Sequence, residues 1–378
     1  MPAIGLWPIA FCPPSSSQNS LTRSIFSNKS CRPTRVVKAR KEETVVISFA
    51  LLGCGRIGAM HARNLAKAPG ARLATVFDPN AEVAEAAAQA NGCTVSASAE
   101  AAIRDADAVL IATSTPTHAD LIEVAAKAGK AILCEKPIDL SLDRVKACRK
   151  AIEGCDVPIQ IGFNRRFDPG HRAARDARAT GRIGTLEQVI ITSRDPGPPP
   201  RAYTAVSGGI YRDMTIHDFD LARFMLGEEP TEVFATGSAL VDPSIGPEFG
   251  DVDSIMVVMR TASGKLCHIN NSRRATFGYD QRVELLGSDG MLISDNRKAH
   301  ELKAFGAAAT DAAEPFLNFF MQRYAEAFEA EIAGFVSAIR DRTPVQASFD
   351  DGYRALVLAE AAIASAKAGG SVKIETIG

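Results

Sequence analysis

The stretch VVISFALLGCGRIG, residues 45–58, decides the fold. Its first part, residues 45–52, is an almost continuous apolar run, which is typical of a strand buried on both faces of a parallel sheet. The glycines that follow are Gly53, Gly55 and Gly58, and a helix is predicted from residue 56 to residue 67. In such a strand–turn–helix unit the first glycine makes a tight turn, the second lets a pyrophosphate approach the backbone, and the third lets helix and strand pack closely. The stretch therefore predicts a dinucleotide site with phosphate at the helix N-terminus.

The pattern around this stretch alternates between short β-rich runs and helical segments. Further strands and helices are predicted at 71–77, 79–90, 108–112, 119–128, 131–134 and 157–163. Strands that alternate with helices of this length indicate right-handed βαβ units and a doubly wound parallel sheet. We therefore predict an α/β Rossmann domain over residues 44–165.

The second half of the chain has a different pattern, with few helices between its strands. Strands are predicted at 186–193, 231–238, 254–261, 265–272 and 281–286, and helices at about 211–226, 316–340 and 351–367. The Ser263-Gly264 pair marks a hairpin turn between two of the strands. We therefore predict, over residues 166–378, an α+β domain with a mostly antiparallel open sheet. This domain would bind the substrate or join subunits, and its C-terminal helices could pack back on the first domain.

Residues 1–41 differ in composition from the rest of the chain. They are rich in Ser, Lys and Arg and contain no acidic residue, which is typical of an organellar transit peptide. The sequence Val-Lys-Ala at 37–39 resembles the end of a plastid presequence, so a plastid is the expected destination. The alternatives are a mitochondrial presequence, a secretory signal with its apolar core at 4–11, and a disordered leader on a cytoplasmic chain.

Composition also excludes several kinds of partner. The residues after the leader carry a net negative charge, which argues against nucleic acid. No apolar run approaches the roughly 20 residues that cross a bilayer. The eight cysteines include no Cys-x-x-Cys pair, which favours reduced thiols over zinc ligands or a disulfide scaffold.

Asp78 indicates which dinucleotide binds. It lies 20 residues after Gly58, at the end of the second predicted strand, where a carboxylate can accept hydrogen bonds from both ribose hydroxyls. It would repel a 2′-phosphate, so NAD is favoured over NADP. Loops after the later strands should border the same crevice, although His118 could instead cap a helix. The expected cofactor contacts are Gly53, Gly55, Arg56, Ile57, Gly58, Asp78, Thr113, Ser114, Thr115, His118, Glu135 and Lys136.

Several short motifs occur in order along the chain. They are Glu135-Lys136-Pro137, GFNRRFDP at 162–169, DMTIHD at 213–218, YDQR at 279–282 and Arg323-Tyr324-Ala325. Together with the glycine turn, this set resembles the Gfo/Idh/MocA oxidoreductase family, and within it most closely the enzymes that oxidise inositol. The resemblance implies NAD-dependent oxidation of a secondary alcohol on a cyclic polyol or sugar, with myo-inositol at C2 as the first expectation. It also implies a homo-oligomer, a dimer or a tetramer.

The resemblance implies a catalytic set of Lys136, Asp213 and His217. Asp213 and His217 are four residues apart on the helix predicted at 211–226, so they should face the same way. A carboxylate beside an imidazole fixes its orientation and raises its basicity, which suits His217 as general base. Lys136 would stabilise the developing alkoxide. No metal is needed, because the cofactor accepts the hydride. The alternative is an ordinary surface pair.

The resemblance also suggests substrate contacts. These are Asn164, Arg165, Asp195 and Tyr279, whose alternative readings include a surface ion pair for Arg165, a turn cap for Asp195 and a half-buried core aromatic for Tyr279. Asp218 and Asp220 are interpreted as solvated charges on the helix surface. Two other functions stay open: another sugar or sugar-phosphate dehydrogenase of the family, and a non-catalytic NAD-binding regulatory protein.

Overall fold

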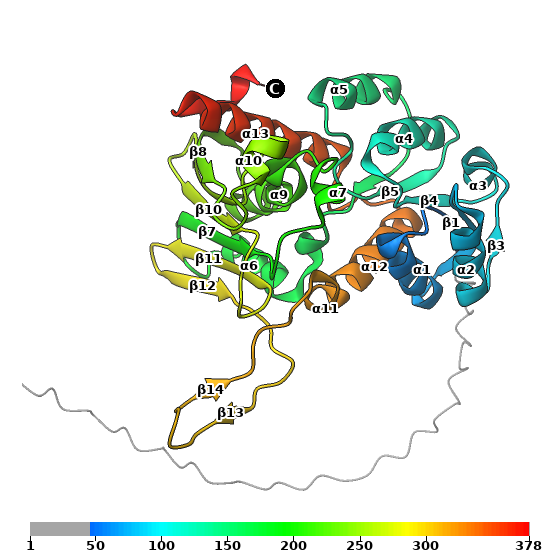
Figure 1. Cartoon of the computed structure of the whole chain (residues 1–378). Helices are drawn as coiled ribbons and strands as arrows, with labels where there is room; N and C mark the ends of the chain where they lie inside the picture. The colour runs from blue at the N-terminus through cyan, green and yellow to red at the C-terminus, as the bar shows by residue number, and fades with distance from the viewer. Residues whose placement is uncertain (1–45, 378) are drawn as a thin grey trace, which may run out of the picture. The chain divides into compact units, whose positions relative to one another are not determined.

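The structure, a computed structural model, describes residues 46–377 and begins with a parallel sheet (Figure 1). Its strands are β1 (Ile47–Leu52), β2 (Ala71–Phe77), β3 (Thr94–Val95), β4 (Ala108–Ile111), β5 (Ala131–Cys134) and β6 (Ile159–Ile161). They lie in the order β3-β2-β1-β4-β5-β6, and all neighbouring pairs are parallel. This is the predicted doubly wound sheet. The carboxyl ends of its strands share one edge, where ligands bind in such folds.

Helices cover both faces of this sheet. One face packs against α1 (Arg56–Lys67), α2 (Ala81–Asn91) and α12 (Ala325–Asp341). The other face packs against α3 (Ala99–Arg104), α4 (His118–Lys127) and α5 (Leu142–Ala151). The alternation along β1 explains the division, since Phe49 and Leu51 point to the first face and Ala50 and Leu52 to the second. The ring of Phe49 packs edge-on against Phe335 of α12, at 6.2 Å between centroids. A helix from near the C-terminus thus completes the core of the first sheet (Figure 1).

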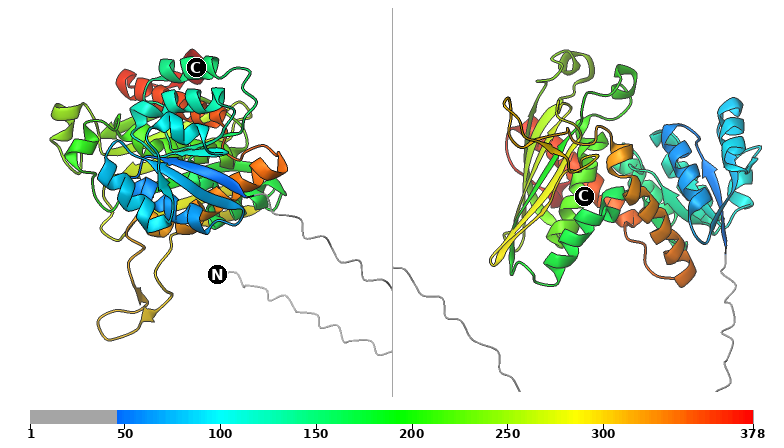
Figure 2. Two further views of the ribbon diagram at one scale, coloured as in Figure 1. Left: turned by 90° about the vertical axis from the view of Figure 1, so that its right-hand side faces the viewer. Right: turned by 90° about the horizontal axis from the view of Figure 1, so that it is seen from below.

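The second sheet is mostly antiparallel, as predicted. Its strands are β7 (Leu186–Arg194), β8 (Pro230–Ser238), β9 (Ser254–Thr261), β10 (Leu266–Ser272), β11 (Asp280–Gly287), β12 (Gly290–Ser294) and β15 (Val372–Lys373). They lie in the order β12-β11-β7-β10-β9-β8-β15, and only the β7–β10 pair among them is parallel. One face contacts α9 (Thr215–Leu226) and α13 (Phe349–Ala368), and a layer of helices separates the two sheets (Figure 2).

The remaining elements are short or lie at the edges of the sheets. They are η1 (Thr115–Thr117), η2 (Asn164–Phe167), α6 (Pro169–Ala179), α7 (Arg201–Thr204), α8 (Ile210–Asp213), α10 (Ile245–Phe249), β13 (Lys303–Ala304), β14 (Ala312–Ala313), α11 (Phe320–Arg323) and η3 (Ile374–Thr376). Across residues 46–377 no helix, α13 included, is long and apolar enough to span a membrane.

The helix predicted at about 211–226 is divided into two. α8 ends at Asp213 and α9 begins at Thr215, with Met214 between them. The hydroxyl of Thr215 lies 3.2 Å from the carbonyl oxygen of Ile210 and 2.8 Å from Oδ1 of Asn271 on β10. Such side-chain contacts with the backbone compete with the regular helical ladder. The end of α9 is as predicted, because Gly227 adopts the left-handed conformation that closes a helix.

The helix predicted at 316–340 begins later than expected. Phe316 is extended: its N–H donates to Phe277 O (3.0 Å), and it forms a β-bridge with Lys298. Residues 299–315 form an arm, visible in Figure 1, that carries the β13–β14 hairpin and is exposed throughout.

Candidate functional site

Each glycine of the turn after β1 has a separate physical reason to be glycine. Gly53 has φ of +89°, and a Cβ there would lie 2.5 Å from the carbonyl oxygen of Ala112. A Cβ on Gly58 would lie 1.9 Å from Gly53 O, so this position allows α1 to pack on the turn. A Cβ on Gly55 would meet no protein atom within 4 Å. The space beside Gly55 is therefore not filled by the protein. This fits a position where the pyrophosphate of a dinucleotide approaches the backbone.

Asp78 lies directly beside this turn. Its Oδ2 accepts a hydrogen bond from the N–H of Cys54 (2.8 Å), and its Oδ1 accepts one from the N–H of Asn80 (2.9 Å). A carboxylate has about four lone-pair sites, so both oxygens can still accept bonds from ribose hydroxyls. Burial, and to a smaller extent the charge of Asp78, raise the pKa of the Cys54 thiol to about 11. This cysteine therefore stays a protonated, unreactive thiol at neutral pH.

His118 holds the loop after β4 in place. Both nitrogens of its ring contact backbone carbonyl oxygens of the protein. The buried ring has Nδ1 2.8 Å from Pro137 O and Nε2 3.0 Å from Thr113 O. It therefore ties the 113–118 loop to the turn after β5. Oγ1 of Thr113 lies 2.6 Å from Oγ1 of Thr117 within the loop. Thr113, Ser114 and Thr115 are at the carboxyl edge of the sheet, as a cofactor contact requires.

Arg56, Ile57 and Glu135 contact neighbouring protein groups. The guanidinium of Arg56 lies 5.6 Å from the centre of the Phe319 ring, and Ile57 packs in the cluster around Tyr324 and Phe328. Oε1 of Glu135 lies 2.7 Å from Nε2 of His61 on α1. Their contacts with a cofactor stay a prediction.

Lys136 and Asp213 meet at the carboxyl edge of the first sheet. Nζ of Lys136 donates to the carbonyl oxygen of Asp213 (2.8 Å) and lies 3.6 Å from its Oδ1. The carboxylate is 10% exposed, and it also receives hydrogen bonds from Arg273 (2.7 Å to Oδ2) and the hydroxyl of Tyr203 (2.7 Å to Oδ1). Burial alone would raise the pKa of Asp213, but Lys136 and then Arg273 outweigh burial and lower it. Asp213 is therefore ionised at neutral pH.

His217 has a different environment from the one expected. Within residues 46–377 no hydrogen bond joins it to Asp213, because the helix is interrupted at Met214 and the Asp213 carboxylate is taken by Arg273 and Tyr203. Nδ1 of His217 is buried without a hydrogen-bond partner, and its ring packs edge-on against Phe163 at 6.2 Å. Burial lowers its pKa well below the usual value, and Lys136 and Arg165 lower it further. The imidazole is therefore neutral.

The four predicted substrate residues are partly brought together. Arg165 is buried on η2, where it pairs with Asp218 and donates to Oγ of Ser193 (2.9 Å). Asp195 accepts a hydrogen bond from Arg273 (2.9 Å), and the electrostatic influence of Arg165 reaches both Asp195 and Tyr279. The ring of Tyr279 is mostly buried and packs edge-on against Tyr324 at 6.1 Å. Asn164 is also buried on η2.

The interpretation of Asp218 and Asp220 as solvated charges is wrong. Both are buried, at 0% and 1% exposure. Asp218 pairs with Arg165, and Asp220 accepts two hydrogen bonds from Arg166, at 2.6 and 2.8 Å. The two arginines lie more than 50 residues before the two carboxylates, so the local spacing of neither segment indicates this pairing.

Arg273 and Tyr203 are site residues that sequence reasoning missed. Arg273 follows β10 beside a second arginine, Arg274, and Tyr203 lies on the short helix α7. Neither position carries a pattern that distinguishes it in one sequence.

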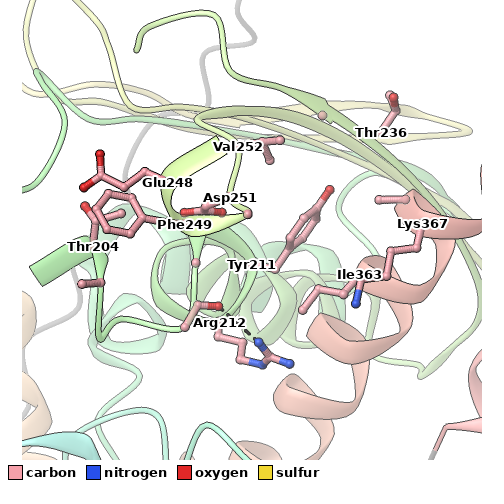
Figure 3. A pocket seen from close by; sticks show the side chains of 16 residues that line it. Thr204, Tyr211, Arg212, Thr236, Glu248, Phe249, Asp251, Val252, Ile363 and Lys367 are labelled. Carbon is pink, nitrogen blue, oxygen red and sulfur yellow. Dashed lines mark hydrogen bonds between the residues drawn. The ribbon is translucent and has the colours of Figure 1, made fainter. Parts of the chain in front are cut away.

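A cavity of about 710 Å³ is lined in part by α8, and Figure 3 shows its lining side chains. Tyr211 and Arg212 of α8 line it, together with Asp251, Phe249 and Lys367 from other elements. Lys136, Asp213 and His217 do not line this cavity, so it is separate from the predicted catalytic set.

Comparison with known proteins identifies the family. The family model described as "Oxidoreductase family, NAD-binding Rossmann fold" matches residues 47–163, and "GFO/IDH/MocA C-terminal domain" matches residues 171–293. The chain is 51% identical to "Inositol 2-dehydrogenase" of Rhizobium meliloti over 85% of this chain and 97% of the relative. It is 41% identical to "Myo-inositol 2-dehydrogenase" of Thermotoga maritima over 87% and 99% of the two chains. A crystal structure of scyllo-inositol dehydrogenase from Lactobacillus casei, with NAD(H) and scyllo-inositol bound, superposes with a TM-score of 0.81 at 27% identity, covering 87% and 99% of the two chains.

The predicted plastid destination is wrong. The relatives come from bacteria, which points against a plastid or mitochondrial transit peptide. The composition of residues 1–41 is the sole basis for that prediction, and a basic, serine-rich composition also occurs in disordered segments that carry no targeting function. These residues lie outside the described part of the chain.

Fold and comparisons agree on cofactor and class of reaction. The parallel sheet carries the glycine turn, with Asp78 beside it, and the matching family model is that of an NAD-binding Rossmann domain. The chain belongs to the Gfo/Idh/MocA family and is an NAD-dependent oxidoreductase.

Proposed function

We propose that the protein oxidises a secondary alcohol on the ring of a cyclic polyol, with myo-inositol at C2 as the first choice. The observation that supports this most is the contact of the Lys136 ammonium with Asp213 at the carboxyl edge of the NAD-binding sheet. The neutral imidazole of His217 lies nearby. The names of the two relatives, both inositol 2-dehydrogenases, support the choice of substrate.

His217 is the proposed general base. A base must be unprotonated before it acts, and burial together with Lys136 and Arg165 holds the pKa of His217 low, so it is neutral. Nδ1 of His217 is buried without a hydrogen-bond partner, and Nε2 is not among the buried atoms that lack one. Nε2 is therefore the nitrogen that we propose accepts the alcohol proton.

Lys136 is the proposed electrostatic group. Its ammonium is held by the carbonyl oxygen and the carboxylate of Asp213, and its side chain is 15% exposed. A fixed positive charge in a mostly buried site stabilises the oxygen as it becomes an alkoxide, and no rearrangement is needed during the reaction. Asp213 thus acts on the alcohol through Lys136 and not through His217. NAD, when bound, supplies the acceptor for the hydride that leaves the carbon.

A substrate panel tests this function. The purified protein is mixed with NAD or NADP and with myo-inositol, scyllo-inositol, other inositols and aldoses, and NADH or NADPH formation is followed by absorbance. We expect NAD-dependent turnover of myo-inositol. Turnover of aldoses alone would favour a sugar dehydrogenase, and NAD binding with no turnover of any polyol or sugar would favour a regulatory protein.

We also propose that the protein is a homo-oligomer joined through the second sheet. Strands β8, β9, β10 and β12 expose large apolar side chains on the face away from α9 and α13; these are Phe234, Met256, Val258, Leu266, Met291 and Ile293, each between 41% and 55% exposed. Large apolar side chains exposed on four strands of one sheet face are typical of a subunit interface. Light scattering coupled to gel filtration would measure the number of subunits.

A further inference from the structure

Arg273 bridges two acidic side chains of the proposed site. Its Nη2 donates to Oδ2 of Asp213 (2.7 Å), and its Nη1 donates to Oδ2 of Asp195 (2.9 Å). The three groups come from different elements, since Asp195 follows β7, Asp213 ends α8 and Arg273 follows β10. The Arg273 side chain is 9% exposed, so this bridge is largely shielded from water.

The two oxygens of Asp213 have different partners. Oδ2 is taken by Arg273, while Oδ1 receives the Tyr203 hydroxyl at 2.7 Å and lies 3.6 Å from Nζ of Lys136. Arg273 therefore determines how the carboxylate is rotated, and the rotation places Oδ1 beside the Lys136 ammonium. Asp213 thus holds the Lys136 ammonium, which is the charge proposed to stabilise the alkoxide, and Arg273 holds Asp213.

Arg273 lies between the negative charges of Asp195 and Asp213. The negative charge of Asp213 disfavours the ionisation of Asp195. The cations that face the two carboxylates are Arg273 for both, Lys136 for Asp213 and Arg165 for Asp195. Burial raises the pKa of Asp195, and Arg273 is the largest of the opposing effects. Two buried carboxylates without a shared cation cannot both stay ionised at little cost.

We propose that Arg273 is a positioning residue for the alcohol oxidation: by bridging Asp195 and Asp213 it fixes the carboxylate that holds Lys136 and keeps Asp195 available as an acceptor for a substrate hydroxyl. This inference rests on the proposed function, in which Lys136 acts on the alcohol. An arginine is required because its planar fork presents parallel donors to two carboxylates, whereas a lysine is a point charge.

The test compares three variants with a matched control. Arg273→Gln removes the charge and the fork, Arg273→Lys keeps the charge alone, and Asp195→Asn/Arg273→Gln removes one carboxylate together with its cation. The control is Arg274→Gln, since the neighbouring arginine is exposed. For each variant kcat and KM are measured from acid to neutral pH, and the dissociation constant of NADH is measured by fluorescence.

Arg273→Gln should lower kcat by about 100-fold, since a displacement of roughly 1 Å in a catalytic group costs that much. It should also move the acid limb of the kcat/KM profile to higher pH, because the carboxylates lose the cation that keeps them ionised. Arg273→Lys should restore the acid limb but not kcat. The double variant should restore the acid limb in the same way, because the remaining carboxylate no longer faces a second one. NADH binding should stay unchanged throughout, and Arg274→Gln should behave as the unmodified protein.

Two results would overturn the proposal. One is unchanged kcat and pH profile in Arg273→Gln. The other is an equal loss of kcat in all three variants with an unmoved acid limb, which would mean that Arg273 only supports the fold.

The pH dependence of Tm tests the bridge without turnover. The contribution of Asp213 to stability is present above its unfolded pKa and is lost as pH falls through its lowered folded pKa. Arg273→Gln should therefore lower Tm at neutral pH, with a difference that shrinks towards acid pH, and the double variant should recover part of the loss. If the unmodified protein oxidises no polyol, the proposed function fails, but this Tm series still decides whether the bridge exists. A constant difference at every pH would count against it.

Discussion

The chemistry of single residues in this site depends on which groups enclose them. His217 and Asp213 are separated by only three residues, yet the imidazole is kept neutral by burial and nearby cations while the carboxylate is kept ionised by Lys136 and Arg273. Two titratable groups whose pKa values are moved apart in this way are suited to different tasks, one to accept a proton and the other to hold a charge.

Replacement of His217 tests its task directly. His217→Ala should lower kcat with myo-inositol by about 100-fold or more, which is the usual contribution of a general base. NADH affinity, measured by fluorescence, should change little, because the His217 ring packs against Phe163. His300→Ala, in the exposed arm, is the control. Full activity in His217→Ala would show that another group takes the proton.

Replacement of Asp78 tests the choice of dinucleotide. Asp78→Asn keeps an oxygen that can accept the N–H of Cys54 or Asn80, so the turn should stay intact. It removes the charge that repels a 2′-phosphate, and like charges in contact cost on the order of several kcal/mol, so the preference for NAD over NADP should fall by about tenfold or more. The ratio of kcat/KM for the two cofactors is the measurement. An unchanged ratio would mean that Asp78 does not face the ribose.

At the level of helices and strands, the sequence predicts elements well where the signal is local. The helix from Arg56 to Lys67 is found with the predicted bounds, because the glycines and the apolar spacing that determine it lie within it. The start of α12 could not be predicted, because Phe316 is drawn into a bridge with Lys298 and a bond to Phe277, both far away in sequence.

The same distinction applies to the site. The glycine turn depends on local geometry and was predictable, whereas the burial of Asp218 depends on Arg165, 53 positions away. The family resemblance predicted Lys136, Asp213 and His217, but not that Asp213 binds Arg273 instead of His217. The residue spacing within one helix cannot predict a hydrogen-bond partner that lies on another element, such as Arg273 after β10.

The start of α13 links helix capping to ion pairs. Ser348 and Asp351 form a capping box, and Asp351 also pairs with Arg166 and Arg223, at 2.9 and 3.0 Å. Burial would raise the pKa of Asp351, but Arg166, the Ser348 N–H and Arg223 lower it to about 2. A depressed carboxyl pKa stabilises the folded state above the unfolded pKa, and this stabilisation is lost as pH falls towards 2.

Asp351→Asn should therefore lower Tm at neutral pH. We expect a loss of about 1–2 kcal/mol of stability, discounted for partial exposure to solvent, and a difference from the unmodified protein that narrows between about pH 4 and pH 2. The control is Asp350→Asn, whose carboxylate is 38% exposed and pairs with Arg354 at the surface. Differential scanning calorimetry over this pH range is the measurement. Equal effects of the two substitutions at every pH would contradict the role given to Asp351.

At the level of the whole molecule, the second sheet has one covered and one bare face. Along β9 the residues alternate, with Ile255, Val257 and Met259 buried and Met256 and Val258 exposed. Apolar side chains on both faces of a strand indicate that both faces are buried in the working protein.

A charge on the bare face should break the proposed oligomer. Met256→Glu lies on β9, where the residue is 52% exposed, so the folded chain should tolerate it while the interface should not. Light scattering should show a smaller particle than for the unmodified protein. Val124→Glu, on the outer surface of α4 at 39% exposure, should leave the particle unchanged. The same particle size for Met256→Glu and the unmodified protein would exclude this face as the interface.

The packing of α12 on the first sheet has a consequence for biosynthesis. The strands of that sheet leave the ribosome early, but Phe335, which packs on Phe49, is made near the end of the chain, as is Ile332 of the same cluster. Until then the nascent chain carries an uncovered apolar surface, the kind of surface that chaperones bind and that promotes aggregation. A fragment that stops before residue 325 should therefore be poorly expressed, and supplying a peptide with the sequence of α12 should improve its recovery.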